Sequence, residues 1–138
     1  GLKEAIIELV NQYTDLKQIK FDISCKSADF KNLQFELQRN IYRVVQELIS
    51  NSIKHSHCTA IKINFKRTPE SLQICYSDNG KGFNASKMKK GLGLKSINNR
   101  VYFYGGSINI NSSDKEGVTF DILLPVVFNK ITQSIQTT

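Results

Sequence analysis

Four polar residues recur along one predicted helix at spacings that would let them act on a shared ligand. They stand at i, i+4, i+7 and i+8 and therefore share one stripe of the helix surface: Glu47, Asn51, Lys54 and His55. A carboxylate can orient a nucleophile, an amide oxygen can ligate a hard metal ion, and a cation can neutralise phosphate. Taken alone, the stripe is more typical of a solvated helix face, so it needs support from elsewhere in the chain.

A glycine-containing segment after a predicted strand supplies part of that support. Asp78 ends the strand, and Gly80 and Gly82 follow it. Glycine allows backbone conformations and close approaches that a side chain forbids, while Asp78 can accept a hydrogen bond from an exocyclic amine. The alternative for Asn79-Gly80 is an ordinary hairpin turn. The lysine-containing stretch that comes next does not pair as a short hairpin, which favours a ligand-binding loop.

A second glycine segment, Gly91-Leu92-Gly93-Leu94, opens a predicted helix. Exposed N–H groups and the positive end of the helix dipole suit such a position to phosphate. The segment lacks the Gly-Lys-Ser/Thr ending of a Walker loop and the third glycine of a dinucleotide fingerprint. Because a pair of glycines is weak on its own, its value lies in its order after the other two segments.

Hydrophobic periodicity predicts the elements that position these residues. Apolar residues at three-to-four spacing indicate helices over 2–14, 33–55 and 94–104. Alternation indicates strands over 19–25, 61–66, 72–76, 107–111 and 118–124. Hairpins interrupted by helices predict an α+β two-layer sandwich, in which a mixed, mainly antiparallel sheet is covered by helices on one face.

The composition fits one compact domain. The chain has 138 residues, of which 40% are hydrophobic and 22% charged, which are ordinary values for a globular protein. We expect the domain to occupy residues 1–128, and residues 129–138, which are polar and weakly periodic, to form a flexible tail. No apolar run approaches the ~20 residues that a membrane-spanning helix needs.

The cysteines and the net charge limit the cellular environment and the kinds of partner that fit this chain. Cys25, Cys58 and Cys75 are odd in number and widely spaced, which suits neither a disulfide framework nor a zinc site and favours a reducing, cytoplasmic environment. Cys25 continues the apolar alternation of its strand, as a small core residue would. The net charge of +7 raises nucleic acid as an alternative. Because that charge is mostly scattered, we expect no nucleic-acid partner.

Taken in order, three segments resemble the N, G1 and G2 boxes of the GHKL ATPases, the superfamily of gyrase, heat-shock chaperones, histidine kinases and mismatch-repair ATPases. They are Gln46-Glu47-Leu48-Ile49-Ser50-Asn51-Ser52-Ile53-Lys54-His55, Asp78-Asn79-Gly80-Lys81-Gly82 and Gly91-Leu92-Gly93-Leu94. The flanks Ile41-Tyr42-Arg43-Val44-Val45-Gln46-Glu47 and Asn98-Asn99-Arg100-Val101 look like those of the NarL-type subfamily of sensor kinases. The resemblance covers residues 33 to 125, and three boxes in order are a specific signal.

The resemblance implies a Bergerat fold that binds ATP together with Mg²⁺. Asp78 matches the residue that hydrogen-bonds the adenine amine, and Asn51 matches the residue that ligates the magnesium ion bridging the phosphates. Glu47 matches the position that orients or deprotonates the phosphate acceptor. Lys54 and His55 match positions near the phosphates.

The resemblance also implies a lid that closes over the nucleotide. Its hinges match four glycines: Gly80, Gly82, Gly91 and Gly93. Leu92 and Leu94 belong to the same nucleotide-binding box. The sequence departs from the family in one place, because many members have Thr or Ser directly after the glycine that precedes the last strand, where it helps to hold adenine through water. Here Gly117 is followed by Val118, and Thr119 is expected to point to the opposite face.

As a sensor kinase, the chain would work with partners that it does not itself contain. The domain would present the γ-phosphate of Mg-ATP to a histidine on a dimerisation segment of the same, longer protein, and a response regulator would receive the phosphoryl group. We therefore expect the full-length protein to be a homodimer and this domain to be cytoplasmic. The full-length protein could be a membrane-anchored sensor. No histidine precedes His55, so the chain alone should bind ATP without completing autophosphorylation.

Two other functions remain open from the sequence. An anti-sigma-type serine kinase would use Glu47 as a base toward a separate protein, although the flanking Arg43 and Gln46 make it the weaker interpretation. A noncatalytic nucleotide-sensing module would be indicated by loss of Glu47 or Asn51, and both are present.

Overall fold

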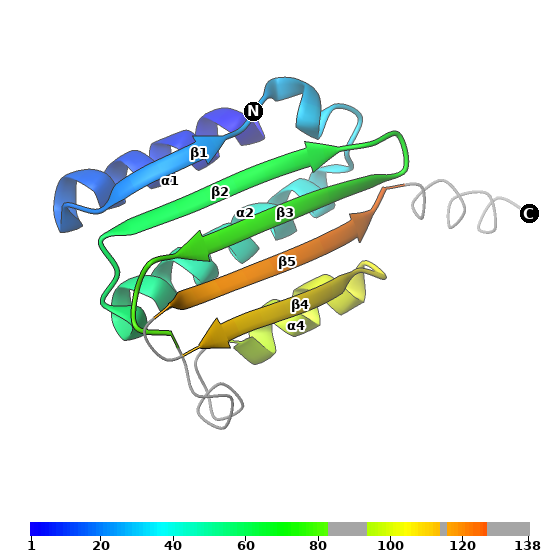
Figure 1. The fold of residues 1–138 in the computed structure, drawn as a ribbon. Helices are drawn as coiled ribbons and strands as arrows, with labels where there is room; N and C mark the ends of the chain where they lie inside the picture. Colours follow the sequence, from blue (N-terminus) through cyan, green and yellow to red (C-terminus); the bar gives the residue numbers. More distant parts are fainter. Residues whose placement is uncertain (83–93, 114–115, 127–138) are drawn as a thin grey trace, which may run out of the picture.

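The computed structural model describes residues 1–82, 94–113 and 116–126 of the chain (Figure 1). The α-helices are α1 (Leu2–Lys17), α2 (Phe35–Asn51) and α4 (Leu94–Phe103), with a short 3₁₀ helix η1 (Ser27–Phe30) and a turn of π-helix η2 (Ser52–Ser56). The strands are β1 (Lys20–Ser24), β2 (Ala60–Arg67), β3 (Ser71–Asp78), β4 (Ser107–Ser113) and β5 (Gly117–Pro125). Within the described residues, no helix is long and apolar enough to cross a bilayer.

The five strands form one sheet in the order β1-β2-β3-β5-β4. Only β1 and β2 run parallel, and the three other pairings are antiparallel. Figure 1 shows α1, α2 and α4 together on one side of this sheet. The α+β two-layer sandwich with a mixed, mainly antiparallel sheet is therefore confirmed.

The core lies between α2 and the inner face of the sheet. The apolar stripe of α2 is fully buried, as are the inward side chains of the central strands β3 and β5. Representative pairs of these layers are Ile41 and Leu48 on α2, and Ile74 and Ile122 on the sheet. Each such side chain contributes about 1.5–3 kcal/mol by leaving water, so burial of one helix face fixes where the rest of α2 points.

The outer face of the sheet is polar. Gln73 on β3 donates from Nε2 to Asp121 Oδ1 on β5 at 2.8 Å, and Cys75 lies beside the same carboxylate. This alternation of buried and polar positions along each strand is the pattern from which the one-sided sheet was predicted.

The structure corrects the predicted central helix over 33–55. The α-helix begins at Phe35 and ends at Asn51, and the next turn, Ser52–Ser56, is π-helical and ends where His57 adopts a left-handed conformation with φ 53°. Ser56 Oγ donates to the carbonyl of Ser52 at 2.8 Å within this turn. Because a π turn holds one more residue than an α turn, residues after Asn51 leave the helical stripe that the sequence spacing predicts.

A 3₁₀ helix over Ser27–Phe30 was missed because its stabilising contacts are not periodic. The backbone N–H of Lys26 donates to Asp29 Oδ2 at 2.9 Å. Phe30 packs edge-on against Phe65, with ring centroids 5.1 Å apart. The first helix also extends to Lys17, beyond the predicted end at residue 14.

All three thiols are partly buried. Burial raises the pKa of Cys25 to about 11, and it also raises the pKa values of Cys58 and Cys75. Cys25 packs against the core, as predicted from its place in the alternation.

Candidate functional site

The carboxylate of Asp78 is held at the end of β3 by two donors. Asp78 is 7% exposed. Its Oδ2 accepts a hydrogen bond from Ser52 Oγ at 2.6 Å, and its Oδ1 accepts one from the backbone N–H of Gly80 at 3.0 Å. An ionised carboxylate has about four acceptor sites, so Asp78 keeps the capacity to accept from a ligand.

A buried tyrosine extends this hydrogen-bond chain. The hydroxyl of Tyr76 lies 2.6 Å from Ser52 Oγ and 3.1 Å from the carbonyl of Leu48. Ser52 gives its one proton to Asp78, so the single phenolic proton of Tyr76 is shared between two acceptors, Ser52 Oγ and the carbonyl of Leu48. Burial raises the pKa of Tyr76 well above its usual value, so the phenol stays protonated and keeps its donor role. Tyr76, Ser52 and Asp78 thus form one oriented chain.

The loop after β3 is pinned against the π turn. Lys81 donates its backbone N–H to the carbonyl of Ser56 at 2.9 Å. A Cβ added at Gly80 would lie 2.6 Å from Ser56 Oγ and closer still to the Ser56 carbonyl oxygen. The close approach that requires Gly80 here is therefore to the protein's own backbone. Gly82 has φ 74°, a conformation that favours glycine.

Gly80→Ala should destabilise the domain, because the atom closest to the new methyl group is a backbone oxygen that cannot rotate away. Overpacking of this kind costs about 1–3 kcal/mol. Urea unfolding of this variant and of Ser77→Ala, a change on β3 away from the contact, would measure the difference in the free energy of unfolding. Equal stability of the two variants would contradict the close packing.

Asn79 fixes the other side of the loop. Its Oδ1 accepts from the backbone N–H groups of Thr59 and Ala60, both at 2.9 Å, and its Nδ2 donates to Thr59 Oγ1 at 3.0 Å. Asn79 therefore joins the end of β3 to the start of β2. In the sequence, Asn79 was interpreted as a turn residue and as a member of the second box, with no role for its side chain.

Glu47 is held from α4 through one of its two oxygens. Its Oε1 accepts from Ser96 Oγ at 2.9 Å and from Arg100 Nε at 3.4 Å. Its Oε2 is buried and has no partner among the described residues. The carboxylate is thus positioned by two donors while its second oxygen keeps its acceptor capacity.

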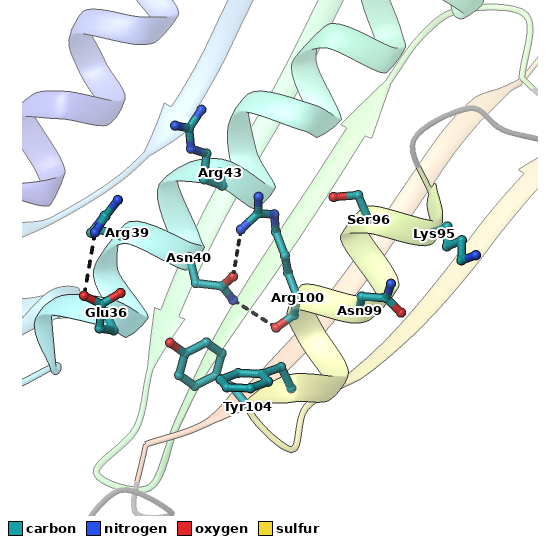
Figure 2. Close-up of a pocket in the computed structure, with 10 residues that line it drawn as sticks. Glu36, Arg39, Asn40, Arg43, Lys95, Ser96, Asn99, Arg100 and Tyr104 are labelled. Carbon is teal, nitrogen blue, oxygen red and sulfur yellow. Dashed lines mark hydrogen bonds and ion pairs between the residues drawn. The ribbon is translucent and has the colours of Figure 1, made fainter.

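A second contact ties α4 to α2. Asn40 donates from Nδ2 to the backbone carbonyl of Arg100 at 2.9 Å, and Arg100 Nη1 donates back to Asn40 Oδ1 at 3.4 Å (Figure 2). Sequence reasoning used Arg100 only as part of a family flank and gave no role to Ser96 or Asn40. The available signal was their helical spacing, because Ser96 and Arg100 stand at i and i+4 and so share one face of α4.

The predicted row on the central helix is only partly preserved. Asn51, the last residue of α2, is 8% exposed, and its Nδ2 is buried without a partner among the described residues. Lys54 is exposed and His55 is half-buried, and both lie in the π turn after the α-helical stripe has ended. Glu47 and Asn51 therefore share the α2 face, and Lys54 and His55 do not continue it.

The second glycine segment was predicted to bind phosphate, but Gly91, Leu92 and Gly93 lie outside the described residues. Leu94 begins α4 and is buried. The predicted tail over 129–138 also lies outside the part of the chain that the structure describes.

The last strand departs from the family pattern at Val118, and the side chains there alternate between the two faces of the sheet as predicted. Val118 pairs with Asp78 across β5 and β3 and is buried, whereas Thr119 is exposed on the opposite face. Gly117 has φ +83°, and a Cβ there would collide with the carbonyl of Asp78. The hydroxyl beside Asp78 comes from Ser52 instead.

A metal site made by protein side chains alone is not found in the described residues, which contain no group of three or more His, Cys, Asp or Glu placed to hold one ion. An ion in this region would have to draw most of its ligands from elsewhere, for example from phosphate oxygens and water.

Comparison with known proteins gives a consistent family match. Residues 36–127 match the family described as histidine kinase-, DNA gyrase B-, and HSP90-like ATPase. The sensor histidine kinase ComP of Bacillus subtilis is 32% identical over 126 residues, a match that covers 88% of this chain and 16% of ComP. The sensor protein VraS of Staphylococcus aureus is 28% identical over 127 residues, covering 91% of this chain and 35% of VraS. The chain thus spans about a third or less of these relatives.

Solved structures share the fold at low sequence identity. The blue-light activated histidine kinase of Erythrobacter litoralis superposes with a TM-score of 0.77 at 17% identity, covering 94% of this chain and 43% of that one. The ATP binding domain of PrrB from Mycobacterium tuberculosis superposes with a TM-score of 0.69 at 15% identity, covering 91% and 93%. The second match shows the same architecture in a chain of similar extent.

Proposed function

The chain belongs to the histidine kinase-, DNA gyrase B-, and HSP90-like ATPases, and from this we propose that it is the ATP-binding catalytic domain of a sensor histidine kinase. The observation that carries the proposal is the buried carboxylate of Asp78, held by Ser52 and Gly80 with acceptor capacity to spare. Residues 1–128 form the domain in this proposal. Its task is to present the γ-phosphate of ATP to a histidine on another segment.

Asp78 is proposed to recognise adenine. An exocyclic amine is a donor, and a buried carboxylate that is already oriented can accept from it without reorganising. Guanine carries a carbonyl oxygen at the corresponding position, which would face the carboxylate as a second acceptor. The site should therefore prefer ATP over GTP.

Asn51 is proposed to be the protein ligand to Mg²⁺. The residues present fit this role, because Asn51 is buried at the end of α2 and no described residue accepts from its amide nitrogen, so the amide is free to turn its oxygen toward an ion. One amide oxygen is enough where phosphates and water supply the other ligands. When bound, the ion would neutralise charge on the phosphates. Lys54 and His55, together with the Gly91-Leu92-Gly93-Leu94 box, are proposed to contact the phosphates.

Glu47 is proposed to orient or deprotonate the acceptor histidine through Oε2, while Ser96 and Arg100 hold Oε1. Phosphoryl transfer asks a protein mainly for positioning and for charge stabilisation. The two donors from α4 keep the carboxylate directed. The remaining oxygen is the atom available to accept a hydrogen bond from an imidazole N–H.

The partners of the domain follow from the names of its relatives, which are a sensor histidine kinase and a sensor protein. We propose that the acceptor histidine lies on a dimerisation segment of a longer, homodimeric protein, and that a response regulator receives the phosphoryl group. This would be a cytoplasmic domain of a membrane-anchored sensor. The flanks around Arg43 and Arg100 support the NarL-type subfamily. These relatives favour a histidine acceptor over the serine of an anti-sigma-type kinase.

Calorimetric titration of the 138-residue chain with ATP and with GTP, each with and without Mg²⁺, tests the proposal directly. Binding of ATP that is strengthened by Mg²⁺ and exceeds binding of GTP would support it. Absence of ATP binding, or equal affinity for the two nucleotides, would refute the assignment of Asp78.

Asn51→Ala should remove the effect of Mg²⁺ on ATP affinity while leaving metal-free binding nearly unchanged. We expect the Mg²⁺-dependent gain to fall at least tenfold, which corresponds to about 1.4 kcal/mol. The same titrations on Asn64→Ala, a change of the same type on the outer face of the sheet, provide the matched control. A full Mg²⁺ effect in Asn51→Ala would rule out the metal role.

A further inference from the structure

A groove of about 990 Å³ lies between α2 and α4, apart from Asp78. Four cations line it: Arg39 and Arg43 from α2, and Lys95 and Arg100 from α4 (Figure 2). A single carboxylate, Glu36, lies among the lining residues. The groove is therefore strongly basic and is formed by two helices that run along its sides.

Only part of this positive charge is neutralised by the protein. Arg39 Nη1 lies 3.7 Å from Glu36 Oε1, and Arg100 Nε lies 3.4 Å from Glu47 Oε1. Among the described residues, Arg43 and Lys95 have no carboxylate partner, and Arg43 Nη1 donates to the neutral Gln46 instead. The groove thus retains two cations on opposite walls for an anionic partner.

One end of the groove is aromatic. Phe103 is 77% exposed, and its ring lies edge-on to that of Tyr104, with the ring centroids 5.0 Å apart. An exposed phenylalanine costs the isolated domain free energy that burial against a partner would recover. Aromatic side chains of this kind commonly anchor protein interfaces.

The groove reaches the residues that hold Glu47. Ser96 and Arg100 line it, and both donate to Glu47 Oε1. Figure 2 shows both side chains directed from α4 toward α2. A segment lying in the groove would therefore pass next to the carboxylate proposed to act on the phosphate acceptor.

We propose that this groove docks the segment that carries the phosphoacceptor histidine, bound as an amphipathic helix with carboxylates facing Arg43 and Lys95 and apolar side chains on Phe103. The inference rests on the proposed function, since it names the partner surface of the same reaction. An amphipathic helix that lies in a groove of its partner is a common mode of protein recognition. The basic lining selects an acidic helix and sets its register relative to Glu47.

Nucleic acid is the competing occupant of a basic groove. It would need a track of cations along its phosphates and bases stacked along the same path. Here the aromatic residues lie at one end only, and two of the four cations are paired with carboxylates of the domain. An acidic helix with an apolar end matches both features.

The test compares autophosphorylation of the longer protein with ATP binding by the domain. Arg43→Gln/Lys95→Gln removes both unpaired cations without creating a like-charge pair. The control, Lys31→Gln/Lys66→Gln, makes the same change at exposed lysines that do not line the groove. We expect the groove variant to bind Mg-ATP within about twofold of wild type and to phosphorylate its histidine about tenfold more slowly, with a weaker dependence on salt.

The aromatic end has its own matched pair. Phe103→Ala should slow autophosphorylation, whereas Tyr102→Ala, also exposed on α4 but outside the groove, should not. If both groove variants phosphorylate at the wild-type rate, or if a groove variant and its control slow equally, the docking proposal is overturned. Loss of binding to a duplex oligonucleotide with unchanged autophosphorylation would also overturn it, in favour of nucleic acid. A wild type that binds no ATP would instead refute the proposed function.

Discussion

The Asp78→Asn variant should bind Mg-ATP about a hundredfold more weakly than the wild type. The substitution keeps the size of the side chain, so Ser52 can still donate to the remaining oxygen. It removes a charged acceptor, which costs about 1.5–3 kcal/mol, and can leave an amide N–H facing the adenine amine. Since each 1.4 kcal/mol is a factor of ten in affinity, a loss of roughly two orders of magnitude follows.

Asp121→Asn is the matched control for this prediction. It makes the same chemical change in the same sheet, but Asp121 lies on the outer face with Gln73. The control should bind ATP as the wild type does, and thermal unfolding would show whether either variant has lost its fold. Binding by Asp78→Asn within about threefold of the wild type would remove Asp78 from adenine recognition.

The second large effect is expected at Glu47. In the longer protein, Glu47→Gln should slow histidine phosphorylation by 10²- to 10⁴-fold, the usual range for a lost general base. Glutamine can still accept from Ser96 and Arg100 through its carbonyl oxygen. The amide nitrogen that replaces Oε2 cannot take a proton from the acceptor. ATP affinity should therefore change by less than about twofold.

Single-turnover transfer from labelled ATP, measured beside equilibrium binding, separates these two quantities. Glu8→Gln on α1 makes the same change at an exposed position remote from α4 and should leave both quantities unaltered. Wild-type transfer by Glu47→Gln would exclude the base. A parallel loss of ATP binding would indicate that Glu47 acts on the nucleotide instead.

Periodicity predicted the elements whose burial decides their conformation. The apolar stripe of α2 and the alternation of β2, β3 and β5 are local patterns, and each reports one face turned to the core. The π turn after Asn51 is different, because its last residue, Ser56, is contacted by the loop after β3, from which the Lys81 N–H donates to the Ser56 carbonyl. The sequence of the helix itself contains no pattern that predicts a contact with the loop after β3.

The candidate site likewise contains residues that local sequence patterns predict and residues that only the fold brings together. Asp78 and Asn51 were predicted from the order of the motifs, and the structure puts both in buried positions. The partners of Asp78 were missed, although Tyr76 stands two residues before it on the same strand face. The donors to Glu47 were missed because they cross between helices, with Arg100 53 residues away in sequence. Pairings over such distances require the fold before they can be seen.

The partial burial of the three native thiols makes the domain convenient for site-directed labelling. Raised pKa values leave little thiolate on Cys25, Cys58 and Cys75 at neutral pH, and the thiolate is the form that reacts with maleimides. A cysteine introduced at the exposed Thr119 would therefore take up a fluorophore selectively. Its neighbour Val118 pairs with Asp78, so the label would stand on the far side of the sheet from the proposed adenine site and could report its occupancy without blocking it.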